Sequence, residues 1–102
     1  MKRIVLDASN WGSILDIYDA LLPAIGAPLW HGKSIDALVD SMIYGDINAL
    51  ASPYVVVVRG TKTLPEGVRT QLLLIKDALY TAASPGLDAN GNEVDVGLVV
   101  ED

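Results

Sequence analysis

The sequence predicts an α/β fold in which a three-stranded parallel sheet is packed by three main helices and one short helical turn. The strongest observation is the continuous β-branched run over residues 54–59, because such runs are typical of strands buried on both faces of a parallel sheet. Segments with helical periodicity stand before and after this run. The predicted order is β-α-α-β-α-β, in which helices between successive strands favour right-handed parallel crossovers.

The chain is predicted to begin with a strand and a helix. Residues 2–6 are partly β-branched and lead into a polar turn, which indicates a short strand. Asn10 is a suitable cap for a first helix over residues 11–26, and Pro23 suggests a kink or an early stop near its end. Apolar residues recur at helical spacing along this helix: Trp11, Ile14, Leu15, Tyr18, Leu21, Leu22 and Ile25.

A loop and a second helix are predicted next. Residues 26–33 contain Gly and Pro and predict a loop despite their apolar side chains. Ser34 is a good N-cap for a helix over residues 35–44, and Gly45 suits its C-terminal cap. Residues 46–51 are expected to add one short helical turn.

The C-terminal half is predicted to hold one long helix and the last strand. After a polar loop over residues 60–64, Pro65 and Glu66 open a helix that residues 84–86, Ser-Pro-Gly, bring to an end. Its predicted inner stripe is Val68, Leu72, Ile75, Leu79 and Ala82. Residues 94–100 are valine-rich and are predicted to form the last strand.

Length and charge narrow the class of protein. The 102 residues fit a single domain spanning 1–102. Thirteen acidic residues against seven Lys and Arg give a net charge of -6, which repels nucleic-acid phosphates and attracts a basic partner. Direct nucleic-acid binding is therefore not expected. Hydrophobic residues make up 51% of the chain, enough for a core and some surface to face a partner or a second copy, so a homo-oligomer is possible.

Nothing in the chain predicts a membrane or secretory protein. Its apolar stretches fall far short of the roughly 20 residues that a membrane-spanning helix needs. The N-terminal apolar run is too short for a secretory signal and lacks a cleavage site. The sequence contains no cysteine, which agrees with a reducing compartment. A cytoplasmic protein is expected.

Few residues suggest metal or cofactor chemistry. His31 is the single histidine, and with no cysteine the chain lacks the ligands that zinc sites need. Residues 88–93 resemble a calcium loop only superficially, since the glycine is misplaced and the distal glutamate is absent. No phosphate-binding glycine loop and no GxSxG motif occurs. No catalytic residue, cofactor or metal is predicted.

Two carboxylates on the second helix are the most informative polar residues. Asp36 and Asp40 are four residues apart, a spacing at which like charges destabilise an isolated helix by about 0.2–0.5 kcal/mol. The helix N-terminus offsets that cost for Asp36 but not for Asp40. The predicted inner positions (Ile35, Leu38, Val39 and Met42) leave Asp36, Asp40 and Tyr44 along another face, with Trp30 near its start. An aromatic residue beside carboxylates suits a protein interface, and a plain solvated helix face is an equally good interpretation.

The segment from Trp30 to Asp40 is similar to a motif of the barstar family. It runs Trp-His-Gly-Lys-Ser-Ile-Asp-Ala-Leu-Val-Asp, against the family pattern aromatic, aromatic, Gly, x, Asn, Leu, Asp-Ala-Leu-Trp-Asp. The shared Gly-x-x-x-Asp-Ala-Leu-x-Asp is moderately specific. Length, acidity, element order and the Pro-Tyr before the valine-rich strand extend the resemblance over essentially the whole domain.

The resemblance implies an inhibitor of a basic, extracellular-type microbial ribonuclease that plugs the active site of its partner. By position, Asp40 is the principal phosphate mimic, Asp36 its neighbour and Trp30 the aromatic wall. Asp77 of the third main helix corresponds to a carboxylate that also reaches the ribonuclease. The partner-binding set implied in this way is Trp30, His31, Gly32, Asp36, Val39, Asp40, Tyr44 and Asp77.

Several positions depart from the family pattern. His31 replaces the usual second tyrosine, Lys33 stands where an acid is common, Ser34 replaces Asn, and Val39 replaces Trp. Changed rim residues with retained charges favour a different cognate ribonuclease over a lost function. Two alternatives stay open: an interaction module for another toxin, a regulator or a second copy, and a small hydrolase using Asp36, Asp40 and His31.

Overall fold

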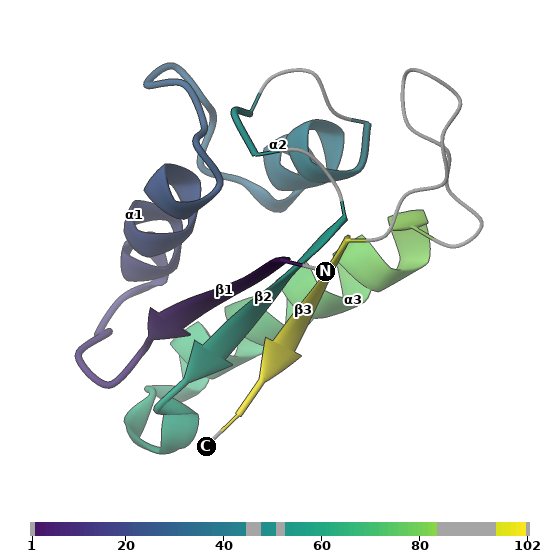
Figure 1. The fold of residues 1–102 in the computed structure, drawn as a ribbon. Coiled ribbons are helices and arrows are strands. Elements are labelled where there is room, and N and C mark those ends of the chain that lie inside the picture. Colours follow the sequence, from purple (N-terminus) through teal and green to yellow (C-terminus); the bar gives the residue numbers. More distant parts are fainter. Residues whose placement is uncertain (1, 45–47, 51–52, 84–95, 102) are drawn as a thin grey trace.

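A computed structural model describes residues 2–44, 48–50, 53–83 and 96–101 of the chain (Figure 1). Its strands and helices follow the predicted order. They are β1 (Lys2–Asp7), α1 (Ile14–Ala24), α2 (Ile35–Val39), the π-helical turn η1 (Asp40–Tyr44), β2 (Tyr54–Arg59), the 3-10 turn η2 (Thr61–Thr63), α3 (Glu66–Ala83) and β3 (Val96–Val100).

The three strands form one parallel sheet in the order β1-β2-β3. The predicted α/β fold class, with the order β-α-α-β-α-β, is therefore confirmed. The β-branched run 54–59 is the central strand, as its composition predicts, because it pairs with β1 over residues 54–59 and with β3 over residues 54–58. Val57 pairs in register with Val5 on one side and with Val99 on the other.

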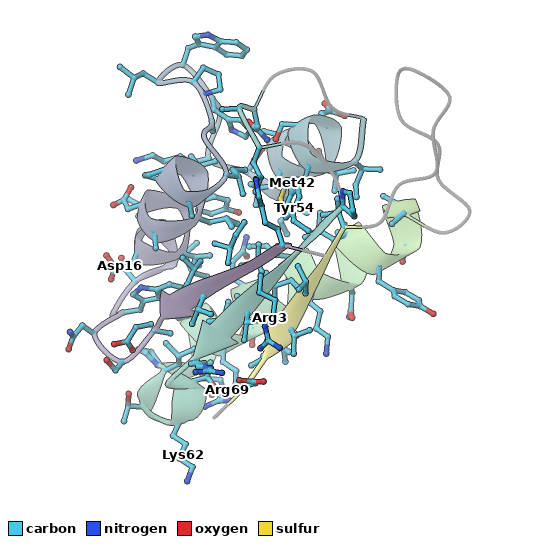
Figure 2. All side chains as sticks on the ribbon, viewed as in Figure 1. Arg3, Asp16, Met42, Tyr54, Lys62 and Arg69 are labelled. Carbon is cyan, nitrogen blue, oxygen red and sulfur yellow. The ribbon has the colours of Figure 1, made fainter. Side chains whose placement is uncertain are left out.

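The helices cover one face of this sheet (Figure 1). Alternate strand residues turn toward them and join a core built from all three strands and all three α-helices. Met42 of η1 and Tyr54 of β2 belong to this core (Figure 2). On the opposite face Val5 and Val99 are 52% and 42% exposed, so the expectation of a central strand buried on both faces holds only for Val57, which its two cross-strand neighbours shield.

The first helix begins later than predicted. Its N-cap is Ser13 and not Asn10, because the Asp16 carboxylate accepts hydrogen bonds from the backbone N–H groups of Gly12 and Ser13 at 2.7 and 3.0 Å. The buried face is made by Ile17, Tyr18, Leu21 and Ile25. Ile14 and Leu15, expected on that face, are 43% and 55% exposed, since Ile14 lies in the first turn and Leu15 at the margin of the face.

The third helix agrees closely with its predicted pattern. Val68, Leu72, Ile75 and Leu79 are buried and Ala82 packs against the core. The preceding segment, predicted as a polar loop, is the 3-10 turn η2, in which Thr61 is fully buried. For the short turn expected over residues 46–51, the described residues 48–50 form bends. The predicted Gly45 cap, the end of the helix at 84–86, the turn at 88–93 and the start of the last strand at 94–95 lie outside the described residues.

Within the described residues, no helix combines the length and apolar character that crossing a membrane requires. No three His, Cys, Asp or Glu side chains gather into a possible metal site in the same part of the chain.

Candidate binding surface

The loop after α1 is fixed at its start by a glycine-dependent cap. Gly26 has φ +70°, and its N–H donates to the Pro23 carbonyl while Ala27 N–H donates to the Leu22 carbonyl, the hydrogen-bond pair of a Schellman motif. A Cβ at Gly26 would lie 2.6 Å from Ala49 Cβ. Glycine is therefore required both by the left-handed backbone and by the close approach of Ala49.

A tight turn then exposes two large apolar side chains. His31 N–H donates to the Pro28 carbonyl at 3.0 Å, which places Leu29 and Trp30 at the two central positions of a turn. Leu29 is fully exposed and Trp30 is 75% exposed. Trp30 is therefore not part of the core, and the aromatic residue predicted for the contact is available on the surface.

The second helix starts at the predicted residue and changes type at Asp40. Ser34 Oγ accepts the Ala37 N–H at 3.1 Å, so the predicted N-cap is confirmed. The helix is α-helical over Ile35–Val39 and π-helical over Asp40–Tyr44. The wider π-turn explains why Ser41, Met42 and Ile43 are all buried in succession, and such turns occur often at functional sites.

The carboxylates of this segment face solvent. Asp36, in the first turn of α2, and Asp40, at the start of η1, are exposed. Within the described residues neither side chain makes a hydrogen bond or an ion pair, because the two ion pairs there are Lys33–Asp19 and Arg59–Glu101. Both carboxylates are thus free to meet cations of another molecule.

The remaining predicted residues divide into surface and interior. Gly32 is exposed, and Val39 is half-buried against the core. Tyr44 lies in η1, but its side chain is outside the described part of the structure. Asp77 is exposed on α3, where Leu73, Leu74 and Tyr80 are also exposed. Since α3 runs against the strand direction, Asp77 in its C-terminal half lies toward the end of the molecule that carries α2 (Figure 1).

His31 is 7% exposed and its ring is bonded inside the protein. Its Nδ1 lies 2.7 Å from the Gly32 carbonyl oxygen and its Nε2 lies 2.7 Å from Ser41 Oγ. Both ring nitrogens are therefore engaged away from Asp36 and Asp40, and the structure does not assemble these three residues into an acid–base site. A direct contact of His31 with a partner stays a prediction.

The family was tested by comparison with known proteins. The family model described as Barstar (barnase inhibitor) matches residues 1–98. The chain belongs to the barstar family. No curated protein matches the chain.

Membership in the barstar family agrees with where the candidate surface lies on the fold. The segment from Trp30 to Tyr44 is at the edge of the sheet where the strands begin (Figure 1). Open α/β enzymes bind their ligands at the opposite edge, beyond the carboxyl ends of the strands. The barstar family is an inhibitor family. Its motif in this chain lies on a loop and a helix where the strands begin, at the end of the sheet opposite to the usual ligand site of open α/β enzymes.

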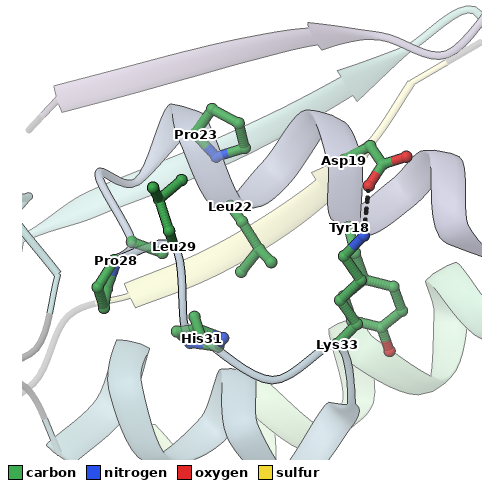
Figure 3. A pocket seen from close by; sticks show the side chains of 9 residues that line it. Tyr18, Asp19, Leu22, Pro23, Pro28, Leu29, His31 and Lys33 are labelled. Carbon is green, nitrogen blue, oxygen red and sulfur yellow. Dashed lines mark hydrogen bonds and ion pairs between the residues drawn. The ribbon is translucent and has the colours of Figure 1, made fainter.

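A cleft of about 360 Å³ lies between α1 and the loop that carries Trp30 (Figure 3). Tyr18, Leu22, Leu29 and His31 line it. Lys33 Nζ and Asp19 Oδ1, 2.9 Å apart, form an ion pair at this cleft. Lys33, a departure from the family pattern, is thus paired with a carboxylate of the same molecule.

Sequence reasoning missed the role of Ser41 altogether. Ser41 is 3% exposed and bonds to His31, ten residues earlier in the chain. Its position between Asp40 and the buried Met42 gave a weak signal, because a hydroxyl on the inner side of a helix needs a partner. Which group supplies that partner depends on how the loop returns to the helix.

Proposed function

We propose that this protein binds and inhibits a basic microbial ribonuclease by covering its active site with the acidic surface formed by Trp30 to Tyr44. The observation that carries the proposal is that one segment exposes Trp30 together with two carboxylates, Asp36 and Asp40, that have no partner among the described residues. Family membership supports the same class of partner.

The chemistry of the surface suits a site that normally holds RNA. A ribonuclease binds phosphate with Arg, Lys or His, and Asp40 offers these groups a fixed carboxylate in place of phosphate. Asp36 adds a second charge and Trp30 supplies apolar contact area, the combination found at interface hot spots. No bond of the inhibitor is broken, so inhibition is competitive occlusion.

Specificity follows from desolvation. Burying Asp40 removes it from water, and only a partner with cationic donors in matching positions compensates for that loss. The net charge of -6 accelerates the encounter with a basic protein. The association rate should therefore fall as salt is added, because salt screens charges farther apart than about 10 Å at 0.1 M.

Calorimetric titration against a panel of basic microbial ribonucleases tests the proposal. The parent protein is compared with Asp40→Asn and with Glu66→Gln, a matched control that removes one exposed negative charge from the start of α3. We expect one-to-one binding that Asp40→Asn weakens by at least a hundredfold, as for a buried charge pair, and that Glu66→Gln leaves nearly unchanged. Thermal unfolding should show that Asp40→Asn is as stable as the parent.

Absence of binding to every ribonuclease would reject this proposal. The family and the fold would stand, and the same surface would then be tested for another partner by sedimentation analysis of the protein alone and by pull-down. Equal weakening by Asp40→Asn and Glu66→Gln would reduce the contact to general electrostatic attraction.

A further inference from the structure

His31 and Ser41 form a buried polar pair that joins the loop to the second helix. The His31 Nε2 and Ser41 Oγ atoms are 2.7 Å apart, and the two residues are 7% and 3% exposed. Few polar pairs in the described residues are so fully enclosed. A buried hydrogen bond of this kind resists breaking, because a buried donor or acceptor left without a partner lowers the free energy of unfolding.

The hydrogen-bond partners indicate which atoms of His31 and Ser41 carry the shared protons. The Gly32 carbonyl oxygen can only accept, so Nδ1 carries a proton and donates to it. In the neutral ring Nε2 is then an acceptor, and the Ser41 hydroxyl donates to it. The contact of Ser41 Oγ with the Leu38 carbonyl is longer, at 3.4 Å. The imidazole is thus held at both nitrogens and cannot rotate without losing a buried bond.

The pair sits next to both residues proposed to carry binding. His31 follows Trp30 and closes the turn that exposes it, through its N–H to the Pro28 carbonyl. Ser41 follows Asp40 in the π-turn. The His31–Ser41 bond therefore joins the backbone segments that carry Trp30 and Asp40.

A second side-chain bond among the described residues, between Lys33 of this loop and Asp19 of α1, is more exposed. Lys33 and Asp19 are 48% and 58% exposed at their side chains, and exposed ion pairs contribute little to stability. Of these two side-chain bonds, the buried pair therefore contributes more than the ion pair to holding the loop.

We propose that His31 and Ser41 are positioning residues that hold Trp30 in register with Asp40 before a partner arrives. The proposal rests on the proposed function of this surface. Its physical basis is preorganisation: a loop already held in the bound arrangement loses less conformational entropy on association. Neither side chain needs to touch the partner for this role.

The first experiment measures the loop without any partner. In a Trp11→Phe background Trp30 is the only tryptophan, since the sequence has two, and its time-resolved fluorescence anisotropy reports local motion. We expect Ser41→Ala to lower the residual anisotropy of Trp30. Asp19→Asn, which removes the exposed ion pair of the same loop, should leave it unchanged.

A second variant separates positioning from simple stability. In the double variant His31→Phe/Ser41→Ala neither new side chain carries a polar atom, and the Gly32 carbonyl that loses its donor belongs to an exposed residue. Such paired replacement is nearly neutral for stability. We expect its melting temperature to recover toward that of the parent while Trp30 stays mobile. If anisotropy recovers together with stability, the pair is structural only and the proposal is overturned.

Affinity for a ribonuclease found in the titration gives the functional measure. We expect about three- to tenfold weaker binding for both Ser41→Ala and the double variant, the range of one hydrogen bond. Unchanged anisotropy and affinity in Ser41→Ala would overturn the positioning role while the inhibitor function stands. A mobile Trp30 in Ser41→Ala, with no ribonuclease bound by the parent, would instead support the pair and reject the function.

Discussion

Helix α3 and the segment α2–η1 are both helical, yet they obey different rules. Over its 18 residues α3 keeps one buried stripe at regular helical spacing. The α2 segment has five α-helical residues and then a π-turn that buries three consecutive residues. The buried side chains of the regular helix α3 pack into the core. In the irregular segment, the π-turn η1 exposes Asp40 to solvent and buries the next residue, Ser41. Departure from regular geometry coincides with the surface proposed to bind.

The largest expected effect on stability comes from truncating a buried leucine in each of the two helical segments. Leu72 of α3 and Leu38 of α2 are both almost fully buried, so Leu72→Ala and Leu38→Ala should each lower the free energy of unfolding by about 2–5 kcal/mol. Denaturant titration measures this loss. At temperatures where both variants are folded, Leu38→Ala should also weaken ribonuclease binding more than Leu72→Ala does, because Leu38 belongs to the helix that carries Asp36 and leads into Asp40.

Equal binding by both leucine variants would break the comparison. It would mean that the geometry of α2 is irrelevant to recognition and that exposed charge alone determines affinity.

A smaller effect is expected from the carboxylate on α3. Asp77 is exposed on α3, where Leu74 and Tyr80 are also exposed. We expect Asp77→Asn to weaken ribonuclease binding by about three- to tenfold, as for a charge at the rim of an interface. Titration calorimetry beside Glu66→Gln, at the other end of the same helix, supplies the control. No difference between the two variants would confine the binding surface to the loop and α2–η1.

Tyr54 of β2 tests how a polar atom buried in the core affects stability. Its hydroxyl is buried with no hydrogen-bond partner among the described residues, and burial raises its pKa to about 12 from the usual 10. Tyr54→Phe should therefore leave stability unchanged or increase it by about 1 kcal/mol. A loss above 1 kcal/mol in denaturant titration would show that the hydroxyl has a stabilising partner.

The same residue predicts an alkaline dependence. Because the folded pKa is the higher one, the contribution of Tyr54 to stability is fully present below pH 10 and is lost as the pH rises toward 12. The parent should lose stability over this range faster than Tyr54→Phe does. Parallel curves for the two proteins would contradict a buried phenol.

The smallest effect is expected at the start of α1. Hydrogen bonds from the Gly12 and Ser13 backbone lower the pKa of Asp16. A lowered folded pKa stabilises the protein above the unfolded value, near 4, and this contribution is lost as the pH falls through the folded pKa. Asp16→Ala should melt slightly below the parent at pH 7, with a difference that shrinks below pH 4. A constant difference down to pH 2 would exclude the carboxylate charge as its cause.

Much of the fold follows from local patterns. The valine-rich run, the stripe from Val68 to Leu79 and the Ser34 cap each depend on residues close in sequence, and each was predicted correctly. The predicted start of α1 was wrong, because two polar residues, Asn10 and Ser13, are both suitable N-caps. Asp16 selects Ser13 by bonding its N–H.

The candidate surface was predictable only in part. Sequence and family resemblance single out Trp30, Asp36 and Asp40, and the structure places all three on the surface. His31 stood in the same list of contacts, yet it is buried. A loop residue has no periodicity to indicate its direction, so its burial could not be inferred.

The sequence alone determined the element order, the parallel sheet and the acidic character of the protein, because these depend on composition and on local periodicity. Tertiary structure alone decided that η1 is a π-turn and that His31 bonds to Ser41. Both outcomes require the loop to return against the helix and exclude water from a polar pair. That arrangement depends on which surfaces fill the same space, which no single segment of the sequence contains.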